Sequence, residues 1–194
     1  YGLSAPPLQI ATAYAALGNG GLLHQPSFVK GQHNPPKRVL DARIANQVLH
    51  MMQTVTEPGG TATQAAILGY HVAGKTGTSR KASAGGYSRR YIGYFAGLVP
   101  VDNPRFAMVV AVNDPDPTRK GYYGGVVAGP VFRNVMEGAL RLMDVSPDNL
   151  DAWLAVQAAA EAKRMKAEGR TPPALPATAA AIAPSGAANA RALQ

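Results

Sequence analysis

The sequence predicts an α+β fold, in which helices pack on the faces of an antiparallel sheet. The predicted elements follow the order helix, helix, strand, strand, strand, helix, which lacks the alternation of strand and helix that builds a parallel sheet. The two clearest strand patterns, residues 91–99 and 105–113, are separated by residues 100–104 alone, and so short a connection forces antiparallel pairing. With 194 residues, of which 46% are hydrophobic, the chain can bury one sizeable core.

Two helices are predicted in the first third of the chain. Ser4 or Ala5 lies near the cap of the first helix, prolines occupy its first turn, and the glycines that follow residue 17 end it. Short extended pieces are expected at residues 27–30 and 38–40. Asp41 is the predicted N-cap of the second helix, residues 41–55. Apolar residues at helical spacing predict its buried face, which consists of Ile44, Val48, Met51, Met52 and Val55.

The remaining elements follow from local composition. Residues 61–68 resemble a short helix, residues 70–75 a strand, and residues 80–90 a long polar loop. Residues 124–143 predict an apolar helix in which Pro130 causes a kink or a late start. We therefore expect one domain over residues 1–149. Residues 150–194 are expected to form an Ala/Lys/Glu-rich helix followed by a Pro/Ala-rich disordered tail.

The composition excludes several classes of function. The chain has no cysteine, which excludes thiol catalysis, cysteine-ligated metal and disulfides. It has no run of 18 apolar residues, so no membrane-spanning segment is expected. The net charge of +8 is spread along the chain and indicates a solvated surface. Because the chain opens on a tyrosine in the middle of what resembles an element, a missing N-terminal portion is expected.

Residues 69–78, GYHVAGKTGT, match two motifs with opposite meanings. Gly69-x-x-x-x-Gly74-Lys75-Thr76 satisfies the phosphate-loop pattern, and Lys75-Thr76-Gly77 also spells the K-T-G box of penicillin-recognising enzymes. A phosphate loop needs a preceding strand, small middle residues and a helix that begins at the lysine. Here the middle residues are bulky and β-prone, and the residues after Thr76 cannot open a helix. The context therefore argues against a nucleotide site.

A K-T-G box instead requires an edge strand beside a cleft, which residues 70–78 can provide. Lys75 supplies positive charge, and the hydroxyls of Thr76 and Thr78 can bind a carboxylate. Gly77 has no Cβ, so a substrate backbone can lie close against the strand. A backbone N–H just past the glycine can point at a developing oxyanion.

Several sequence blocks in the right order carry a resemblance to a known family. They are YGLSAPPLQIATAYAALGNGG, EPGGTATQAA, VAGKTGTSRKASAGGY, YIGYFAGLVP with RFAMVVAVNDP, and GYYGGVVAGPVF. Over residues 1–150 the chain resembles the C-terminal half of the transpeptidase domain of class B penicillin-binding proteins, above all the septal (FtsI-type) peptidoglycan D,D-transpeptidases. The resemblance implies a partial domain of the penicillin-binding transpeptidase and serine β-lactamase-like fold.

The resemblance also implies roles for individual residues. Lys75 would provide the electrostatics that hold the substrate and favour proton movement near a nucleophilic serine, and the N–H of Thr78 would be an oxyanion donor. Thr76 and Thr78 would bind the terminal carboxylate of a D-Ala-D-Ala stem peptide or of a β-lactam. The strand edge would continue through Ser79 and Arg80. An aromatic wall would come from Tyr122 and Tyr123, for which packing at a helix start is the alternative.

The match to the family is incomplete at the nucleophile. The family uses Ser-x-x-Lys and Ser-x-Asn, and this chain contains no Ser-x-Asn. Ser27-Phe28-Val29-Lys30 has the letters of the first motif, but Pro26 and the β-prone Phe-Val pair do not start a helix. We therefore expect no nucleophile in this chain, which would hold one half of an active site.

The expected partners follow from the same resemblance. They are peptidoglycan stem peptides, β-lactams and, through a parent protein, a septal glycosyltransferase and division proteins, at the periplasmic face of the bacterial inner membrane. An elongation-type enzyme and a β-lactam sensor without turnover are the alternatives. No metal, cofactor or nucleic acid is expected, because the four histidines lack ligand spacing and the basic residues 80–90 suit a solvated loop. Asp114-Pro115-Asp116 is expected to form a turn.

Overall fold

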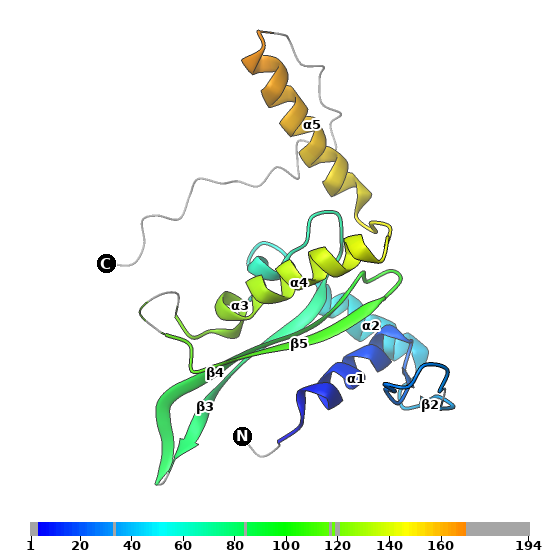
Figure 1. Cartoon of the computed structure of the whole chain (residues 1–194), viewed down its shortest axis with the longest axis vertical. Coiled ribbons are helices and arrows are strands. Elements are labelled where there is room, and N and C mark those ends of the chain that lie inside the picture. Colours follow the sequence, from blue (N-terminus) through cyan, green and yellow to red (C-terminus); the bar gives the residue numbers. More distant parts are fainter. Residues whose placement is uncertain (1–3, 33, 84, 117, 119–120, 170–194) are drawn as a thin grey trace. The chain divides into compact units, whose positions relative to one another are not determined.

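The computed structural model describes residues 4–32, 34–83, 85–116, 118 and 121–169 (Figure 1). In chain order its elements are α1 (Pro7–Gly18), β1 (Leu22–Leu23), β2 (Lys37–Arg38), α2 (Ala42–Gln53), the 3-10 helix η1 (Thr63–Ala65), β3 (Ala73–Ser83), β4 (Gly86–Val99), β5 (Phe106–Asn113), α3 (Gly124–Val127), α4 (Gly129–Leu142) and α5 (Leu150–Ala167). The chain divides into two compact units, residues 1–148 and 149–194. None of the helices in the described part of the chain is long and apolar enough to span a membrane.

The first unit is built on a three-stranded antiparallel sheet with the order β3-β4-β5. This sheet and the helices around it confirm the predicted α+β class. Among the described residues, β3 has β4 as its one partner, so its other edge is open. The register pairs Lys75 with Ala96 and Thr78 with Gly93.

Helices cover both faces of the sheet, and the alternation of β4 residues separates two cores. Phe95 packs edge-to-face on Phe132 of α4, with ring centroids 4.9 Å apart, in the core that α3 and α4 cover. Leu98 points to the opposite face, where it packs with Leu49 of α2 and Ala73 of β3. Figure 1 shows α3 and α4 on one side of the strands, with α1 and α2 on the other. Because successive side chains of a strand alternate between faces, the side chains of β3 also point in turn to the α3 and α4 face and to the α1 and α2 face.

The predicted loop over residues 80–90 is wrong, because β3 and β4 continue through it as a long hairpin. The hairpin turns where Gly85 and Gly86 have φ of +91° and +137°, in the region that favours glycine. The polar composition that suggested a loop belongs to strands that extend past the paired part of β5 (Figure 1). The strand predicted from residue 70 begins at Ala73, and the helix predicted over residues 61–68 is the single turn η1.

The predicted buried face of α2 is partly wrong. The helix buries Ala45 and Leu49, whereas Ile44 is 46% and Met51 is 64% exposed. Two neighbouring stripes of this helix have apolar residues at the same spacing, so periodicity alone does not show which one faces the core. Asp41 caps the helix as predicted, because its Oδ1 accepts the N–H groups of residues 43 and 44 at 2.9 and 3.3 Å.

Other helix boundaries follow their local sequence. The N-cap of α1 is Pro6, next to the predicted Ser4 and Ala5, and Gly20 and Gly21 follow the helix at positive φ. Pro130 lies in the first turn of α4, after a break at Ala128, which confirms the late start. The helix predicted after residue 150 is α5. The predicted disordered tail, residues 171–194, lies outside the described residues.

Candidate functional site on the open edge of β3

The Lys-Thr-Gly-Thr segment lies in the open edge strand β3, and its side chains alternate between the two faces. Lys75 is exposed and shares the α1 and α2 face with Gly77 and Ser79, and its Nζ donates to the carbonyl oxygen of Thr76 at 3.0 Å. Thr76 and Thr78 are half-buried on the face that α3 and α4 cover. A ligand along the edge would therefore meet a cation from one face and two hydroxyls from the other.

Both threonine hydroxyls have partners that fix their positions. Thr76 Oγ1 lies 2.9 Å from Oγ1 of Thr61, in the segment between α2 and η1. Thr78 Oγ1 accepts the N–H of Gly124, the first residue of α3, at 3.2 Å. Each hydroxyl keeps further capacity for a hydrogen bond, because a hydroxyl carries one donor and two acceptor positions. The pair is thus oriented and still able to bind a carboxylate.

Two glycines at the start of α3 allow these contacts. A Cβ on Gly124 would overlap the carbonyl oxygens of Gly77 and Tyr94, and a Cβ on Gly125 would overlap the carbonyl oxygen of Thr61. Only glycine lets α3 approach the strands this closely. By contrast, a Cβ on Gly77 would lie 3.5 Å from the Tyr94 side chain, an ordinary contact. The packing of the described residues therefore does not require glycine at position 77.

Two hollows meet at Lys75. One, with a volume of about 580 Å³, lies beside α2 and the Gly59-Gly60 segment. The other, with a volume of about 670 Å³, follows β3 on the α1 side and is lined by Ile10, Tyr14 and Tyr94 together with residues 75–79. The half-buried Val48 and Met52 and the exposed Met51 line the first hollow, so part of the apolar stripe that was predicted to be buried borders the site. Val55 is buried as predicted.

Three tyrosines stack beside the hydroxyl face of β3. The rings of Tyr91 and Tyr122 lie 4.0 Å apart and nearly parallel, at 10°, and Tyr123 follows at 4.7 Å and 33°. The guanidinium carbon of Arg80 lies 6.0 Å from the centroid of the Tyr91 ring. A hydrogen bond to Tyr123, and then the nearby phenols of Tyr123 and Tyr91, raise the pKa of Tyr122 to about 12. The Tyr122 phenol is therefore neutral at physiological pH.

The structure brings all the predicted site residues to this edge or its flank. Residues 75–80 form one stretch of β3, and Tyr122 and Tyr123 stand at the start of α3. Sequence reasoning missed Thr61, Tyr91 and the two glycines of α3. These residues belong to blocks that carry the family resemblance, namely EPGGTATQAA, YIGYFAGLVP and GYYGGVVAGPVF. The spacing within a block does not indicate which of its residues reach β3.

The structure also decides between the competing motifs. Lys75 and Thr76 lie inside a strand, where no helix begins, so the context that a phosphate loop needs is absent from these described residues. Ser27 starts no helix either. The predicted extended piece at residues 27–30 is wrong, because Ser27 Oγ accepts the N–H of Val29 at 3.0 Å in a local turn. Asp114 stands at a bend with φ of +56°, and Asp116 Oδ1 accepts the N–H of Thr118 at 2.9 Å, so both carboxylates lie in a loop, as expected.

Comparisons with known proteins agree with this geometry. Residues 1–137 match the family described as "Penicillin binding protein transpeptidase domain". The chain is 45% identical over 152 residues to peptidoglycan D,D-transpeptidase FtsI of Escherichia coli (strain K12), covering 77% of this chain and 26% of that protein. It is 46% identical over 149 residues to the probable peptidoglycan D,D-transpeptidase PenA of Neisseria meningitidis serogroup A, covering 76% of this chain and 25% of the relative.

A solved structure supports the fold. The apo TP domain of penicillin-binding protein 3 from Burkholderia pseudomallei superimposes with a TM-score of 0.68 at 36% identity, covering 76% of this chain and 45% of that chain. The chain therefore spans about a quarter of the length of these curated relatives and less than half of the solved domain.

Proposed function

Because the chain belongs to the penicillin-binding protein transpeptidase domain family, we propose that it supplies the Lys-Thr-Gly half of a peptidoglycan D,D-transpeptidase site. The observation that carries the proposal is the open edge of β3, where Lys75, Thr76 and Thr78 meet two hollows. An exposed cation and two oriented hydroxyls suit the carboxylate at the end of a D-Ala-D-Ala stem peptide. They suit the corresponding carboxylate of a β-lactam equally.

The proposed reaction is an acyl transfer through a serine ester. A serine hydroxyl attacks the carbonyl of the penultimate D-Ala, and the terminal D-Ala leaves as the amine. An amine of a neighbouring stem peptide then attacks the ester, forms the cross-linking peptide bond and releases the serine. Lys75 favours the proton movements by its charge, and the N–H of Thr78 is one of the oxyanion donors. The serine would come from a segment outside these 194 residues, because the sequence has no Ser-x-Asn and Ser27 starts no helix.

Further site residues have proposed roles in holding the substrate. Gly77 gives a substrate backbone close access to the strand, which fits the ordinary space that surrounds its missing Cβ. Ser79 and Arg80 extend the binding edge. Tyr122 and Tyr123, with Tyr91 behind them, form an aromatic wall for the apolar part of a stem peptide or a β-lactam side chain.

The biological setting is proposed from the named relatives. The similarity to FtsI favours septal cell-wall synthesis during division, at the periplasmic face of the inner membrane with a glycosyltransferase and division proteins as partners. An elongation-type transpeptidase is the alternative that shares the same site. A β-lactam sensor would bind the drug without turnover, and release of D-Ala from a stem peptide distinguishes an enzyme from a sensor.

The test is penicillin acylation measured by intact mass. We would compare the 194-residue chain alone with a hybrid, defined as the E. coli relative in which residues 1–149 replace the matched segment. The expected result is drug mass on the folded hybrid and none on the chain alone. Lys75→Ala in the hybrid should slow acylation by about 100-fold or more. Lys81→Ala is the matched control, because Lys81 follows the Lys-Thr-Gly-Thr segment on the same strand and its Nζ donates to Asn113 Oδ1 at 3.0 Å. A folded hybrid without acylation, or a chain acylated by itself, would overturn the proposal.

A further inference from the structure

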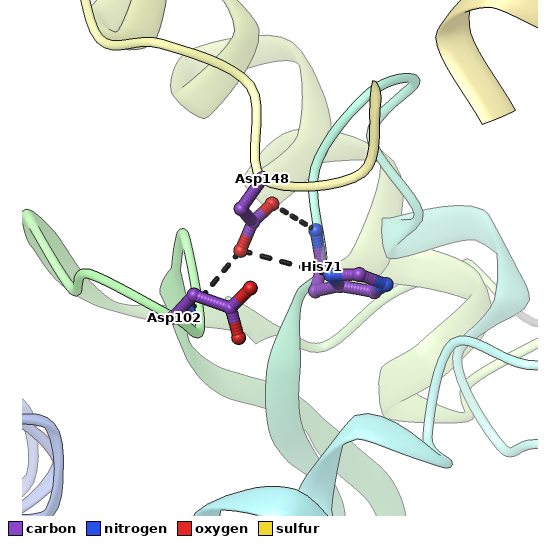
Figure 2. A group of neighbouring side chains, drawn as sticks. All are labelled: His71, Asp102 and Asp148. Atoms are coloured by element: carbon purple, nitrogen blue, oxygen red, sulfur yellow. Dashed lines mark hydrogen bonds and ion pairs between the residues drawn. The ribbon is translucent and has the colours of Figure 1, made fainter. Parts of the chain in front are cut away.

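Three side chains from separate segments converge at the end of the sheet where β3 begins. His71 precedes β3, Asp102 lies in the turn between β4 and β5, and Asp148 follows α4. One potential metal-ligand atom from each lies within 4.8 Å of the other two. Figure 2 shows Asp148 beside the two other residues, with dashed lines from its carboxylate to His71 and to Asp102. The cluster belongs to the first compact unit, and none of its three residues lines either hollow at Lys75.

Asp148 is a rigid member of this cluster. Its side chain is 8% exposed, and its Oδ1 accepts the N–H of His71 at 2.7 Å. Its Oδ2 accepts the N–H groups of Val101 at 2.9 Å and Asp102 at 3.2 Å. A carboxylate has about four lone-pair positions, so these three bonds orient Asp148 and leave room for one further partner.

Two independent observations indicate that this partner is a cation. First, among the described residues, neither Asp102 nor Asp148 has an ion pair with lysine or arginine, so the His71 ring is the group of opposite charge that Asp148 meets, and only when that ring is protonated. Second, Nδ1 of His71 is fully buried and has no hydrogen-bond partner, although the side chain as a whole is 40% exposed. A buried polar atom without a partner is unfavourable, because it has lost its hydrogen bonds to water without replacing them. A cation between the three groups would satisfy the ring nitrogen and both carboxylates together.

We propose that His71, Asp102 and Asp148 bind a divalent transition-metal ion of the Zn²⁺ type. One imidazole nitrogen and two carboxylates suit Zn²⁺, whereas Mg²⁺ and Ca²⁺ prefer oxygen ligands alone. Zinc ligands lie about 2.0–2.2 Å from the metal, so two ligands of a tetrahedral ion are about 3.4 Å apart. The distance between His71 Nδ1 and Asp148 Oδ2 is 3.7 Å, which is close to this separation. Asp102 is exposed on the turn between β4 and β5, and one of its carboxylate oxygens lies within 4.8 Å of the other two ligand atoms.

Binding would cross-link three segments of the chain at the end of the sheet where β3 begins. The ion would tie the segment before β3 to the β4–β5 turn and to the segment after α4. Because ligand binding to the native state stabilises it, the metal should raise the resistance of the first unit to unfolding. Spacing in the sequence could not predict this site, because its three ligands come from three distant segments.

The test is Zn²⁺ binding to the 194-residue chain at pH 7.5, measured by isothermal titration calorimetry with zinc chloride. The expected result is one equivalent bound by the wild type, with affinity at least ~10-fold weaker in His71→Ala and in Asp102→Asn. Asp102→Asn keeps the backbone N–H that Asp148 accepts, so the fold is preserved. His50→Ala is the matched control, because His50 lies on α2 and contacts Gln53.

A second readout separates this site from general binding to histidine. Co²⁺ in a site with three protein ligands and water should give the visible absorption bands of four-coordinate cobalt in the wild type and in His50→Ala, and not in His71→Ala. An excess of Mg²⁺ should leave these bands unchanged. A wild-type chain without zinc binding, or a His71→Ala chain that binds zinc as tightly as the wild type, would overturn the proposal.

Discussion

The hydroxyls of Thr61 and Thr76 lie 2.9 Å apart, although 15 residues separate the two in the chain. Gly125 makes this contact possible, because any side chain there would displace the carbonyl of Thr61. Thr61 has no place in the Lys-Thr-Gly motif, yet it sets the direction of the Thr76 hydroxyl that is proposed to bind a carboxylate. It is therefore a positioning residue for the proposed site.

Thr61→Val should slow penicillin acylation of the hybrid without unfolding it. A net hydrogen bond contributes about 1 kcal/mol, which corresponds to about a fivefold change in rate. The rate constant for acylation, measured with a fluorescent penicillin, checks the prediction. Thr63→Val in the adjacent η1 is the control and should leave the rate unchanged. Equal rates for the two variants would contradict a positioning role for Thr61.

Gly124→Ala should destabilise the chain, whereas Gly138→Ala should stabilise it. A Cβ on Gly124 would overlap backbone oxygens of β3 and β4, which forces α3 away from the sheet at a cost of about 2–4 kcal/mol. Gly138 lies exposed inside α4 with nothing within 4 Å, and alanine there should add about 0.5–1 kcal/mol. The free energy of unfolding in urea measures both. Similar values for the two variants would show that α3 does not need its close approach.

The sequence predicted the layers of the fold well, because its strongest patterns are local. Asp41 caps α2 through its own side chain, and the turn after Val99 forces β4 and β5 to pair antiparallel. The hairpin over residues 80–90 was missed for a physical reason. Strands that extend past their neighbours are solvated on both faces, so Arg89 and Arg90 lack the apolar alternation that marks a half-buried strand.

The candidate site was predictable only in part. Lys75, Thr76 and Thr78 lie in one continuous motif, and local sequence was enough to place them on an edge strand. The stack of Tyr91 on Tyr122 depends on the pairing of β4 with β3 and on the position of α3, which no local pattern contains. Residues that act through tertiary contacts were therefore the ones that sequence reasoning missed.

The Arg90–Asp114 pair should make stability depend on pH in the acid range. Arg90 Nε donates to Asp114 Oδ2 at 2.7 Å, and this bond holds the pKa of Asp114 below its ordinary value of 3.8. A carboxyl whose pKa is lower in the folded state stabilises the protein above the unfolded pKa. That contribution is lost as pH falls through the folded pKa. Thermal unfolding of the wild type and of Asp114→Asn should thus differ at pH 6 and converge below pH 3.8.

Arg90→Gln provides the matched control for this pair. It removes the donor and leaves the carboxyl in place, so the pKa of Asp114 should return toward 3.8 and the pH dependence should fall as it does in Asp114→Asn. Asparagine tolerates the positive φ of residue 114, so the substitution tests the charge and not the turn. A difference between wild type and Asp114→Asn that persists below pH 3 would contradict the assignment.

The tyrosine stack should be visible in the titration of Tyr122. Its pKa is raised to about 12, first by the hydrogen bond to Tyr123 and then by the phenols of Tyr123 and Tyr91. A phenol whose pKa is higher in the folded state stabilises the protein below pH 10, and this contribution is lost as pH rises toward 12. Tyr123→Phe should lower the pKa of Tyr122 toward 10, because it removes the hydrogen bond that makes the largest contribution to the raised pKa.

NMR titration of ¹³Cζ-labelled tyrosine measures this pKa directly in the folded chain. Tyr91→Phe should lower it by less than Tyr123→Phe does, because Tyr91 contributes the smaller part. Tyr14→Phe on α1 is the control and should leave the pKa at about 12, since α1 covers the opposite face of the sheet. A pKa that stays near 12 in Tyr123→Phe would show that the stack does not control Tyr122, and the proposed aromatic wall would lose its geometric support.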